Sequence, residues 1–235
     1  FQCLLAGRKN EVRSLILTAS GGPFRESSHE DLQRVTVEQA LNHPTWDMGA
    51  KVTIDSATLM NKSLEVIEAR WLFDLPPDQI DVVVHPQSIV HSMVEYVDGS
   101  TIAHLGPPDM RVPIQYALTY PERKPLDVPR LRWGEVGKLI FQDPDKTKFP
   151  ALRIAYEVLH AGGTAPTVFN AANEVAVAAF LDERVSFLGI IETVEQALSA
   201  HSVITNPSLD EIFAADVWAR EEATRLLGAA ASQNA

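Results

Sequence analysis

The chain has 235 residues, of which 46% are hydrophobic and 22% are charged, so its length suits one large or two small globular domains. This composition excludes disordered and fibrous proteins. Acidic residues outnumber basic ones by 31 to 20, and the net charge of −11 disfavours binding to nucleic acid or to an anionic membrane. No apolar run approaches the ~20 residues that span a bilayer. The single Cys3 cannot form an internal disulfide, which indicates a reducing, cytoplasm-like compartment.

The first third of the sequence predicts mixed strands and helices. Residues Ser14–Ala19 are rich in Leu, Ile and Thr and end at Ser20-Gly21-Gly22-Pro23, which indicates a strand followed by a tight loop. Thr36 and Gln39 have the spacing of a capping box, which predicts a short helix through Leu41.

A longer helix is expected to begin at Asp55 or Ser56 and to run to about Phe73. Its apolar residues recur at helical spacing, which predicts a buried stripe on one face. The residues of this stripe are Met60, Leu64, Ile67 and Trp71.

The next segment predicts strands. Ile80–Val84 is a continuous β-branched run, which is typical of a buried strand. Ser88–Val97 and Ser100–Leu105 flank Asp98-Gly99, a strong signal for a hairpin turn. We therefore expect a small, mainly antiparallel sheet covered by helices.

The sequence changes character after this sheet. Eight prolines from Pro107 to Pro150 predict an extended connector with one short helix near Val112–Thr119. The remainder predicts helices at Ala151–His160, Pro166–Leu181, Ile190–Ala200 and Ser208–Leu227, the last beginning with a capping box of Ser208 and Glu211.

These elements predict an α+β domain with a small, mainly antiparallel sheet, followed by an all-α C-terminal bundle. The expected boundaries are residues 1–119 for an α/β substrate- and metal-binding domain, 120–148 for the linker and 149–235 for the helical domain.

Two segments carry residues suited to a phosphate. The glycines of Ser20-Gly21-Gly22 allow backbone N–H groups to approach an anion closely, although a plain turn has the same pattern. Asn61 and Glu65 lie one turn apart on the expected helix, with Lys62 beside them and Ser56 at its start. Ser, Asn and Lys can bind a phosphate and Glu can offer an oxygen to a divalent cation. The alternative is a solvated helix face with an ordinary Lys–Glu pair.

A third segment, His43-Pro44-Thr45-Trp46-Asp47-Met48-Gly49, is a loop by its Pro and Gly but carries large apolar side chains. Trp46 and Met48 suggest that the loop covers a ligand, and His43 is a candidate substrate contact or general acid. The other histidines in the strand region lack ligand spacing and are expected to be packed: His85, His91 and His104. The polar segment Asn170–Glu174 is interpreted as structural.

Several of these motifs together resemble the 1-deoxy-D-xylulose 5-phosphate reductoisomerase family. The resemblance runs the length of the chain in the right order. It is carried by Ser20-Gly21-Gly22-Pro23-Phe24-Arg25, His43-Pro44-Thr45-Trp46-Asp47-Met48-Gly49, Asp55-Ser56-Ala57-Thr58-Leu59-Met60-Asn61-Lys62, His85-Pro86-Gln87-Ser88, Pro108-Asp109-Met110-Arg111 and Asn170-Ala171-Ala172-Asn173-Glu174.

The resemblance implies a two-step reaction. The family isomerises its phosphorylated sugar and reduces the product with NADPH to 2-C-methyl-D-erythritol 4-phosphate, a precursor in the non-mevalonate synthesis of isoprenoids. A divalent metal (Mg, Mn or Co) chelates the substrate oxygens. The resemblance also implies a homodimer formed through the sheet, with Ile80–Leu105 as the candidate interface, and a cytoplasmic location, or a plastid one in a plant or alga.

The resemblance also implies a role for each site residue. The phosphate would be bound by Ser20, Ser56, Asn61, Lys62 and His43. Glu65 would bind the metal and a substrate hydroxyl, and it would form the catalytic group together with His43 and Lys62. Trp46 and Met48 would belong to a lid over the sugar, and Gly49 would contact the nicotinamide side of the cofactor.

The family also has an N-terminal NADPH domain and an Asp-Ser-Glu segment with further metal ligands, and neither is found in this sequence. Of the expected metal carboxylates only Glu65 is present, so we expect the chain alone to be inactive. One alternative is a non-catalytic module that binds a sugar phosphate or forms dimers. Another is an unrelated phosphosugar isomerase that uses Lys62 as a Schiff-base amine.

Overall fold

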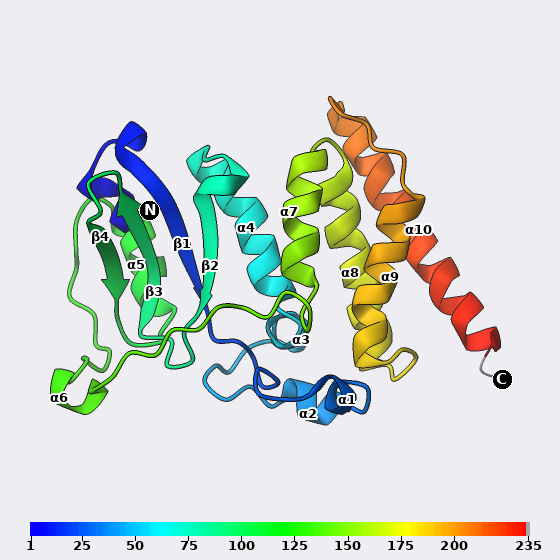
Figure 1. Cartoon of the computed structure of the whole chain (residues 1–235), viewed down its shortest axis with the longest axis horizontal. Coiled ribbons are helices and arrows are strands. Elements are labelled where there is room, and N and C mark those ends of the chain that lie inside the picture. Colours follow the sequence, from blue (N-terminus) through cyan, green and yellow to red (C-terminus); the bar gives the residue numbers. More distant parts are fainter. Residues whose placement is uncertain (234–235) are drawn as a thin grey trace. The chain divides into compact units, whose positions relative to one another are not determined.

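The structure is a computed structural model that describes residues 1–233 and divides into two compact units (Figure 1). The first unit combines Phe1–Ser20 with Asp81–Asp143. The second combines Gly21–Ile80 with the chain from Pro144 onward. Each unit therefore joins two separate stretches of sequence. The domain boundaries expected at residues 119 and 148 stay a prediction.

A four-stranded sheet forms the first unit (Figure 1). Its strands are β1 (Val12–Ala19), β2 (Ile80–Val84), β3 (Val90–Tyr96) and β4 (Thr101–Leu105), in the order β2-β1-β3-β4. Strand β3 pairs antiparallel with both β1 and β4. The C-terminal ends of β1 and β2 lie side by side, where the His85 N–H donates a hydrogen bond of 2.7 Å to the Ala19 carbonyl. The expected small, mainly antiparallel sheet is confirmed.

The β3–β4 hairpin follows from its turn. Gly99 has a φ of +85°, which glycine adopts without a steric penalty, and its N–H donates to the Tyr96 carbonyl at 2.9 Å. The Tyr96 hydroxyl donates to the Cys3 carbonyl at 2.8 Å and so ties the 3₁₀ helix η1 (Gln2–Ala6) to the sheet. The hairpin predicted around Asp98-Gly99 is therefore present.

The proline-rich stretch that follows is mostly irregular. It contains α5 (Arg111–Thr119), close to the helix predicted at Val112–Thr119, and one further short helix, α6 (Trp133–Val136). An isolated bridge between Val84 and Gln142 joins the end of this stretch to β2.

Helices form the second unit. They are α1 (His29–Leu32), α2 (Val37–Leu41), α3 (Ala50–Ala57), α4 (Met60–Phe73), α7 (Ala151–Ala161), α8 (Ala165–Leu181), α9 (Phe187–Ala200) and α10 (Leu209–Gln233). Short 3₁₀ helices also occur along the chain, η2 (Lys9–Glu11) and η3 (Pro77–Gln79). The capping boxes predicted for α2 and α10 are both formed.

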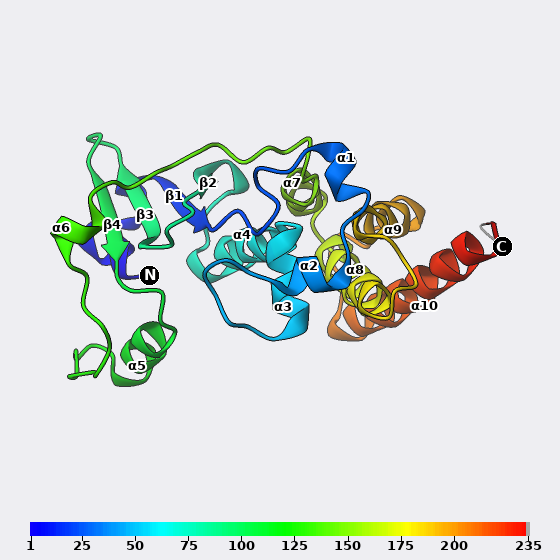
Figure 2. The ribbon, with the colours of Figure 1, turned by 90° about the horizontal axis from the view of Figure 1, so that it is seen from below.

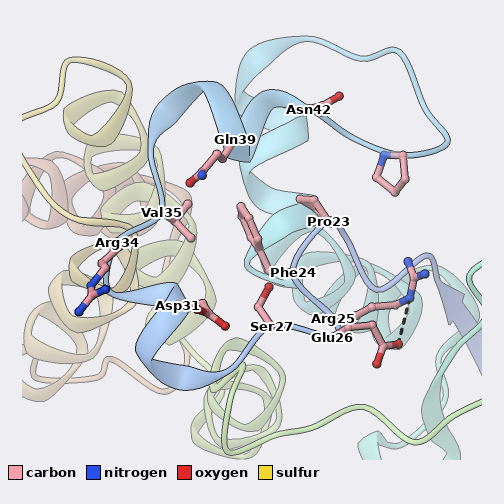
Figure 3. A pocket seen from close by; sticks show the side chains of 11 residues that line it. Pro23, Phe24, Arg25, Glu26, Ser27, Asp31, Arg34, Val35, Gln39 and Asn42 are labelled. Atoms are coloured by element: carbon pink, nitrogen blue, oxygen red, sulfur yellow. Dashed lines mark ion pairs between the residues drawn. The ribbon is translucent and has the colours of Figure 1, made fainter.

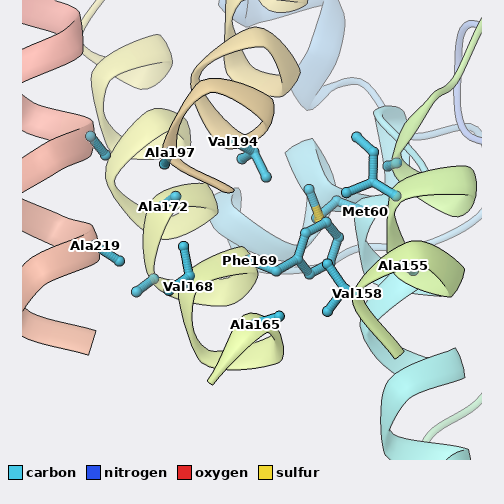
Figure 4. Close-up of a cluster of buried hydrophobic side chains, with 14 of the residues drawn as sticks. Met60, Ala155, Val158, Ala165, Val168, Phe169, Ala172, Val194, Ala197 and Ala219 are labelled. Atoms are coloured by element: carbon cyan, nitrogen blue, oxygen red, sulfur yellow. The ribbon is translucent and has the colours of Figure 1, made fainter. Parts of the chain in front are cut away.

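The bundle is packed on small side chains. Helices α7, α8 and α9 run side by side, and α10 packs against α8 and α9 (Figure 2). Its core places Phe169 of α8 beside Met60 of α4 and Val158 of α7 (Figure 4). Alanines occupy the core positions between the helices, including Ala172 and Ala219, so the helices can approach closely. The predicted C-terminal bundle is confirmed.

The helix expected from Asp55 or Ser56 to Phe73 is instead two helices. The break lies at Leu59, which has a left-handed φ of +61° between α3 and α4. Ser56 therefore lies in the last turn of α3 and not at the positive end of a helix. The expected stripe is also partly wrong, because Trp71 is 67% exposed, beneath the Arg70 guanidinium.

Truncating Phe169 should destabilise the second unit strongly. Its ring is fully buried, so Phe169→Ala leaves a cavity and should lower the free energy of unfolding by about 3–5 kcal/mol. Phe213→Ala is the matched control, because the Phe213 ring on α10 is exposed and its loss should change this free energy by less than about 0.5 kcal/mol. Urea unfolding followed by circular dichroism measures both, and equal losses would contradict the assignment of Phe169 to the core.

Candidate functional site

Three of the predicted residues lie close together in α4, directly after the break between α3 and α4. Glu65 accepts hydrogen bonds from Asn61 Nδ2 at 2.7 Å and from Lys62 Nζ at 2.5 Å. All three residues lie in the first two turns of α4. The N-terminal end of a helix carries a partial positive charge, which adds to that of the Lys62 ammonium.

Local chemistry holds the beginning of α4 in place. The Thr58 hydroxyl donates to the Ile54 carbonyl at 3.1 Å and accepts a hydrogen bond from the Met60 N–H at 3.3 Å. The Ser63 hydroxyl donates to the Leu59 carbonyl at 2.9 Å. These bonds satisfy polar groups that the break would otherwise leave unpaired.

Lys62 is the buried cation of this cluster, with 9% of the residue exposed. An ammonium taken out of water must be paired, and Glu65 supplies the countercharge. An ammonium carries three N–H donors, so the bond to Glu65 leaves two for an anion. The cluster can therefore bind a phosphate group without first losing its internal ion pair.

The glycine loop approaches this region at Ser56. A Cβ on Gly22 would lie 2.7 Å from the Ser56 carbonyl oxygen, and the φ of Gly22 is +65°, so a glycine is required there on both counts. Ser20 comes two residues earlier in the same loop. Ser20 and Ser56 are both half-buried.

The loop with His43 is anchored at both ends. His43 Nδ1 accepts hydrogen bonds from the backbone N–H groups of Thr45 at 3.1 Å and Trp46 at 2.9 Å. The neutral ring therefore carries its proton on Nε2, and burial lowers the pKa of His43, which favours this neutral form. At the other end, the Thr53 hydroxyl donates to the Gly49 carbonyl at 3.0 Å.

The other residues of this loop differ in exposure. Trp46 and Met48 are half-buried, whereas Gly49 is exposed and directly precedes α3. Their roles as lid and cofactor contact stay predictions.

A cavity of about 690 Å³ lies within the second unit (Figure 3). Its lining comes from residues 23–44, with Pro23 and Phe24 beside polar side chains that include Gln39 and Asn42. Arg25 and Glu26 form an ion pair of 3.4 Å at one end. Asn42 and Pro44 flank His43 in sequence, but none of the predicted site residues lines this cavity.

Of the three histidines of the strand region, His85 is buried, as expected, and His91 and His104 are half-buried. His85 is fully buried, is bonded through Nδ1 to the Ile140 carbonyl at 2.8 Å and stacks on Phe141. His91 and His104 contact each other through their rings.

Within residues 1–233, no group of three or more His, Cys, Asp or Glu side chains is placed to hold a metal ion. No helix in this part of the chain has both the length and the apolar character needed to cross a membrane.

Sequence analysis did not single out one buried contact near this site. Asn173 of α8 donates a hydrogen bond of 2.9 Å to the Asp55 carboxylate of α3. The signal for this contact in the sequence is a polar residue among the alanines and valines of α8.

The fold and the site define the chain as an α+β protein in which a small sheet is combined with a helical bundle. Residues 105–222 match the family described as DXP reductoisomerase C-terminal domain, and residues 1–73 match the 1-deoxy-D-xylulose 5-phosphate reductoisomerase C-terminal domain. The chain belongs to the 1-deoxy-D-xylulose 5-phosphate reductoisomerase family.

Individual relatives agree with this assignment. The 1-deoxy-D-xylulose 5-phosphate reductoisomerase of Chlorobium phaeobacteroides is 60% identical over 227 residues, which are 97% of this chain and 59% of that protein. The solved structure of the Zymomonas mobilis enzyme in complex with NADPH matches with a TM-score of 0.90 and 46% identity, over 97% of this chain and 59% of that one. A DOX-P reductoisomerase in complex with NADPH, fosmidomycin and magnesium matches with a TM-score of 0.86 and 44% identity, over 93% of this chain and 56% of that one. This chain thus spans about three fifths of the length of its relatives.

The side chains described here are too few to hold a divalent metal by themselves. Glu65 offers one carboxylate, and among the described residues it is not part of a group of three or more His, Cys, Asp or Glu side chains that could hold a metal ion. We therefore expect this chain alone to bind Mn²⁺ no more tightly than roughly millimolar. Electron paramagnetic resonance of free Mn²⁺ measures this, and a micromolar dissociation constant that Glu65→Gln abolishes would show that the site is complete.

Proposed function

We propose that this chain supplies the sugar-phosphate-binding part of an enzyme that converts 1-deoxy-D-xylulose 5-phosphate to 2-C-methyl-D-erythritol 4-phosphate with NADPH and a divalent metal. The observation that carries the proposal is the cluster of Asn61, Lys62 and Glu65 at the start of α4. Two further findings support the proposal: the chain belongs to the family, and a solved family member is in complex with NADPH and magnesium.

The chain's own residues contribute binding and orientation. The Lys62 ammonium and the Asn61 amide donate to the phosphate, together with the hydroxyls of Ser20 and Ser56. His43 contributes a donor through Nε2 in its neutral form. Phosphate contacts remote from the reacting carbons fix the substrate, which lowers the entropy cost of reaching the transition state.

The loop around Trp46 and Met48 is proposed to exclude water once substrate is bound. Gly49 is proposed to face the cofactor. Glu65 is proposed as one ligand of the metal, whose remaining ligands come from outside the residues described here. The chain alone is therefore proposed to be inactive.

Activity should require more sequence than this chain provides. The assay follows NADPH absorbance with 1-deoxy-D-xylulose 5-phosphate and Mn²⁺. It compares this chain alone with a fusion that adds the N-terminal portion of the Chlorobium phaeobacteroides relative. We expect turnover from the fusion only.

In that fusion, Lys62→Met should raise KM for the phosphorylated substrate by about tenfold or more, because a charged donor is lost. Lys124→Ala is the matched control, since it removes an exposed cation of the first unit that is paired with Glu122. Turnover from the chain alone would overturn the proposed inactivity. An unchanged KM in Lys62→Met would contradict the phosphate role.

The assembly proposed for this protein is a homodimer formed through the sheet. Strand β4 is an edge strand, and its Thr101 and Ile102 side chains are exposed. An edge strand presents unpaired backbone groups that a second copy can pair with. A cytoplasmic location is part of the same proposal and rests on composition and the single, buried thiol of Cys3.

Light scattering should therefore give twice the monomer mass for this chain. Ile102→Lys should shift the population toward monomer, because a charge would then lie in the interface. Leu209→Lys, at an exposed apolar position of α10, is the matched control. A monomeric parent chain, or an equal effect of both substitutions, would contradict the sheet interface.

A further inference from the structure

A buried polar pair joins α3 to α8 within the second unit. Asn173 Nδ2 donates a hydrogen bond of 2.9 Å to Asp55 Oδ1, across 118 residues of sequence. Asp55 is 1% exposed and Asn173 is fully buried. The other oxygen of the Asp55 carboxylate forms an ion pair of 2.6 Å with Lys51 Nζ, one turn earlier in α3.

Burying this polar pair is less favourable than burying apolar side chains at the same positions. Burial raises the pKa of Asp55, although the bonds from Asn173 and Lys51 oppose this shift. Asn173 Oδ1 is buried without a hydrogen-bond partner among the described residues, which carries a desolvation penalty. An apolar side chain at position 173 would avoid that penalty, since its neighbours Ala172 and Ala176 are fully buried. The pair therefore indicates a role other than filling the core.

Asp55 lies in the last turns of α3, directly before the segment 56–65 that carries the proposed phosphate donors Ser56, Asn61 and Lys62. Ser56 follows it directly, and the Asp55 carbonyl accepts a hydrogen bond of 3.2 Å from the Thr58 hydroxyl. That hydroxyl in turn accepts the Met60 N–H, one residue before Asn61. A displacement of Asp55 would therefore shift both the end of α3 and the beginning of α4.

Asn173 contributes the α8 side of the hydrogen bond between α3 and α8. It lies in α8, at the centre of the bundle, where α8 packs against both α9 and α10. The next residue, Glu174, forms an ion pair of 2.7 Å with Arg220 of α10. Arg220 is also held by Asp216 at 2.7 Å. Packing against α9 and α10 and the ion pair of Glu174 thus hold α8, the helix that carries the Asn173 amide.

We propose that Asp55 and Asn173 are positioning residues that hold Ser56 and the beginning of α4 in the geometry that binds phosphate. This inference rests on the proposed function, because it needs the phosphate role of Ser56 and Lys62. The bundle then takes part in substrate binding without touching the substrate.

The test measures the dissociation constant of inorganic phosphate by ³¹P NMR titration of this chain. Asn173→Leu removes the donor at similar volume and should weaken phosphate binding about tenfold, comparable to the loss of one hydrogen bond to a charged group. Asn173→Ser serves if the leucine variant does not fold. Val158→Ala is the matched control, because it lowers the melting temperature through a core cavity in α7 and changes neither partner of the Asp55–Asn173 bond.

The exchange variant Asp55→Asn with Asn173→Asp separates positioning from stability. It restores one amide donor and one carboxylate between the two helices, so it should recover most of the phosphate affinity that Asn173→Leu loses. Suppose that Lys62→Met weakens phosphate binding, as the proposed function requires. If Asn173→Leu and Val158→Ala then have the same dissociation constant for phosphate, the positioning role is wrong. If Lys62→Met has no effect, the proposed function itself is wrong, and the inference falls with it.

Discussion

The left-handed residue between α3 and α4 is the constraint on which the candidate site depends. A leucine with a φ of +61° is unfavourable for an L-residue, by about 1–2 kcal/mol. The surrounding hydrogen bonds of Thr58 and Ser63 offset that cost. Because the chain ends one helix and starts another here, Asn61 and Lys62 lie in a first helical turn. In a continuous helix from Asp55 to Phe73, they would lie in its interior, where backbone N–H groups are already bonded to carbonyls and the terminal dipole has no effect.

The net charge of the protein bears on how the proposed phosphate would be attracted. A net charge of −11 repels an anionic ligand at long range, and salt screens that field beyond about 8–10 Å. Attraction must therefore come from donors close to the anion. Lys62 is suited to this, because its burial places the ammonium where the effective dielectric constant is low and each contact is stronger. Glu65 makes that burial possible in the absence of an anion by supplying the countercharge.

Local chemistry explains which features could be predicted from the sequence. The Asp98-Gly99 turn and the capping boxes at Thr36 and Ser208 depend on neighbours within four residues, and the structure contains all of them. The break at Leu59 could not be predicted, since neither Gly nor Pro marks it. Trp71 was expected in the core because periodicity identifies an apolar face but not what covers it. The hydrogen bond between α3 and α8 spans 118 residues, and no local pattern specifies such a contact.

The two family matches cover residues 1–73 and 105–222, and the Asp55–Asn173 bond joins one to the other. Both residues lie in motifs that carried the family resemblance, although neither was expected to touch substrate. A buried carboxylate and amide at these positions are difficult to explain by stability, because apolar residues would pack there at lower cost. They are explained if the helix end that carries Ser56 must be held against a rigid body. On this view the bundle fixes the geometry of the proposed phosphate contacts without itself touching the ligand.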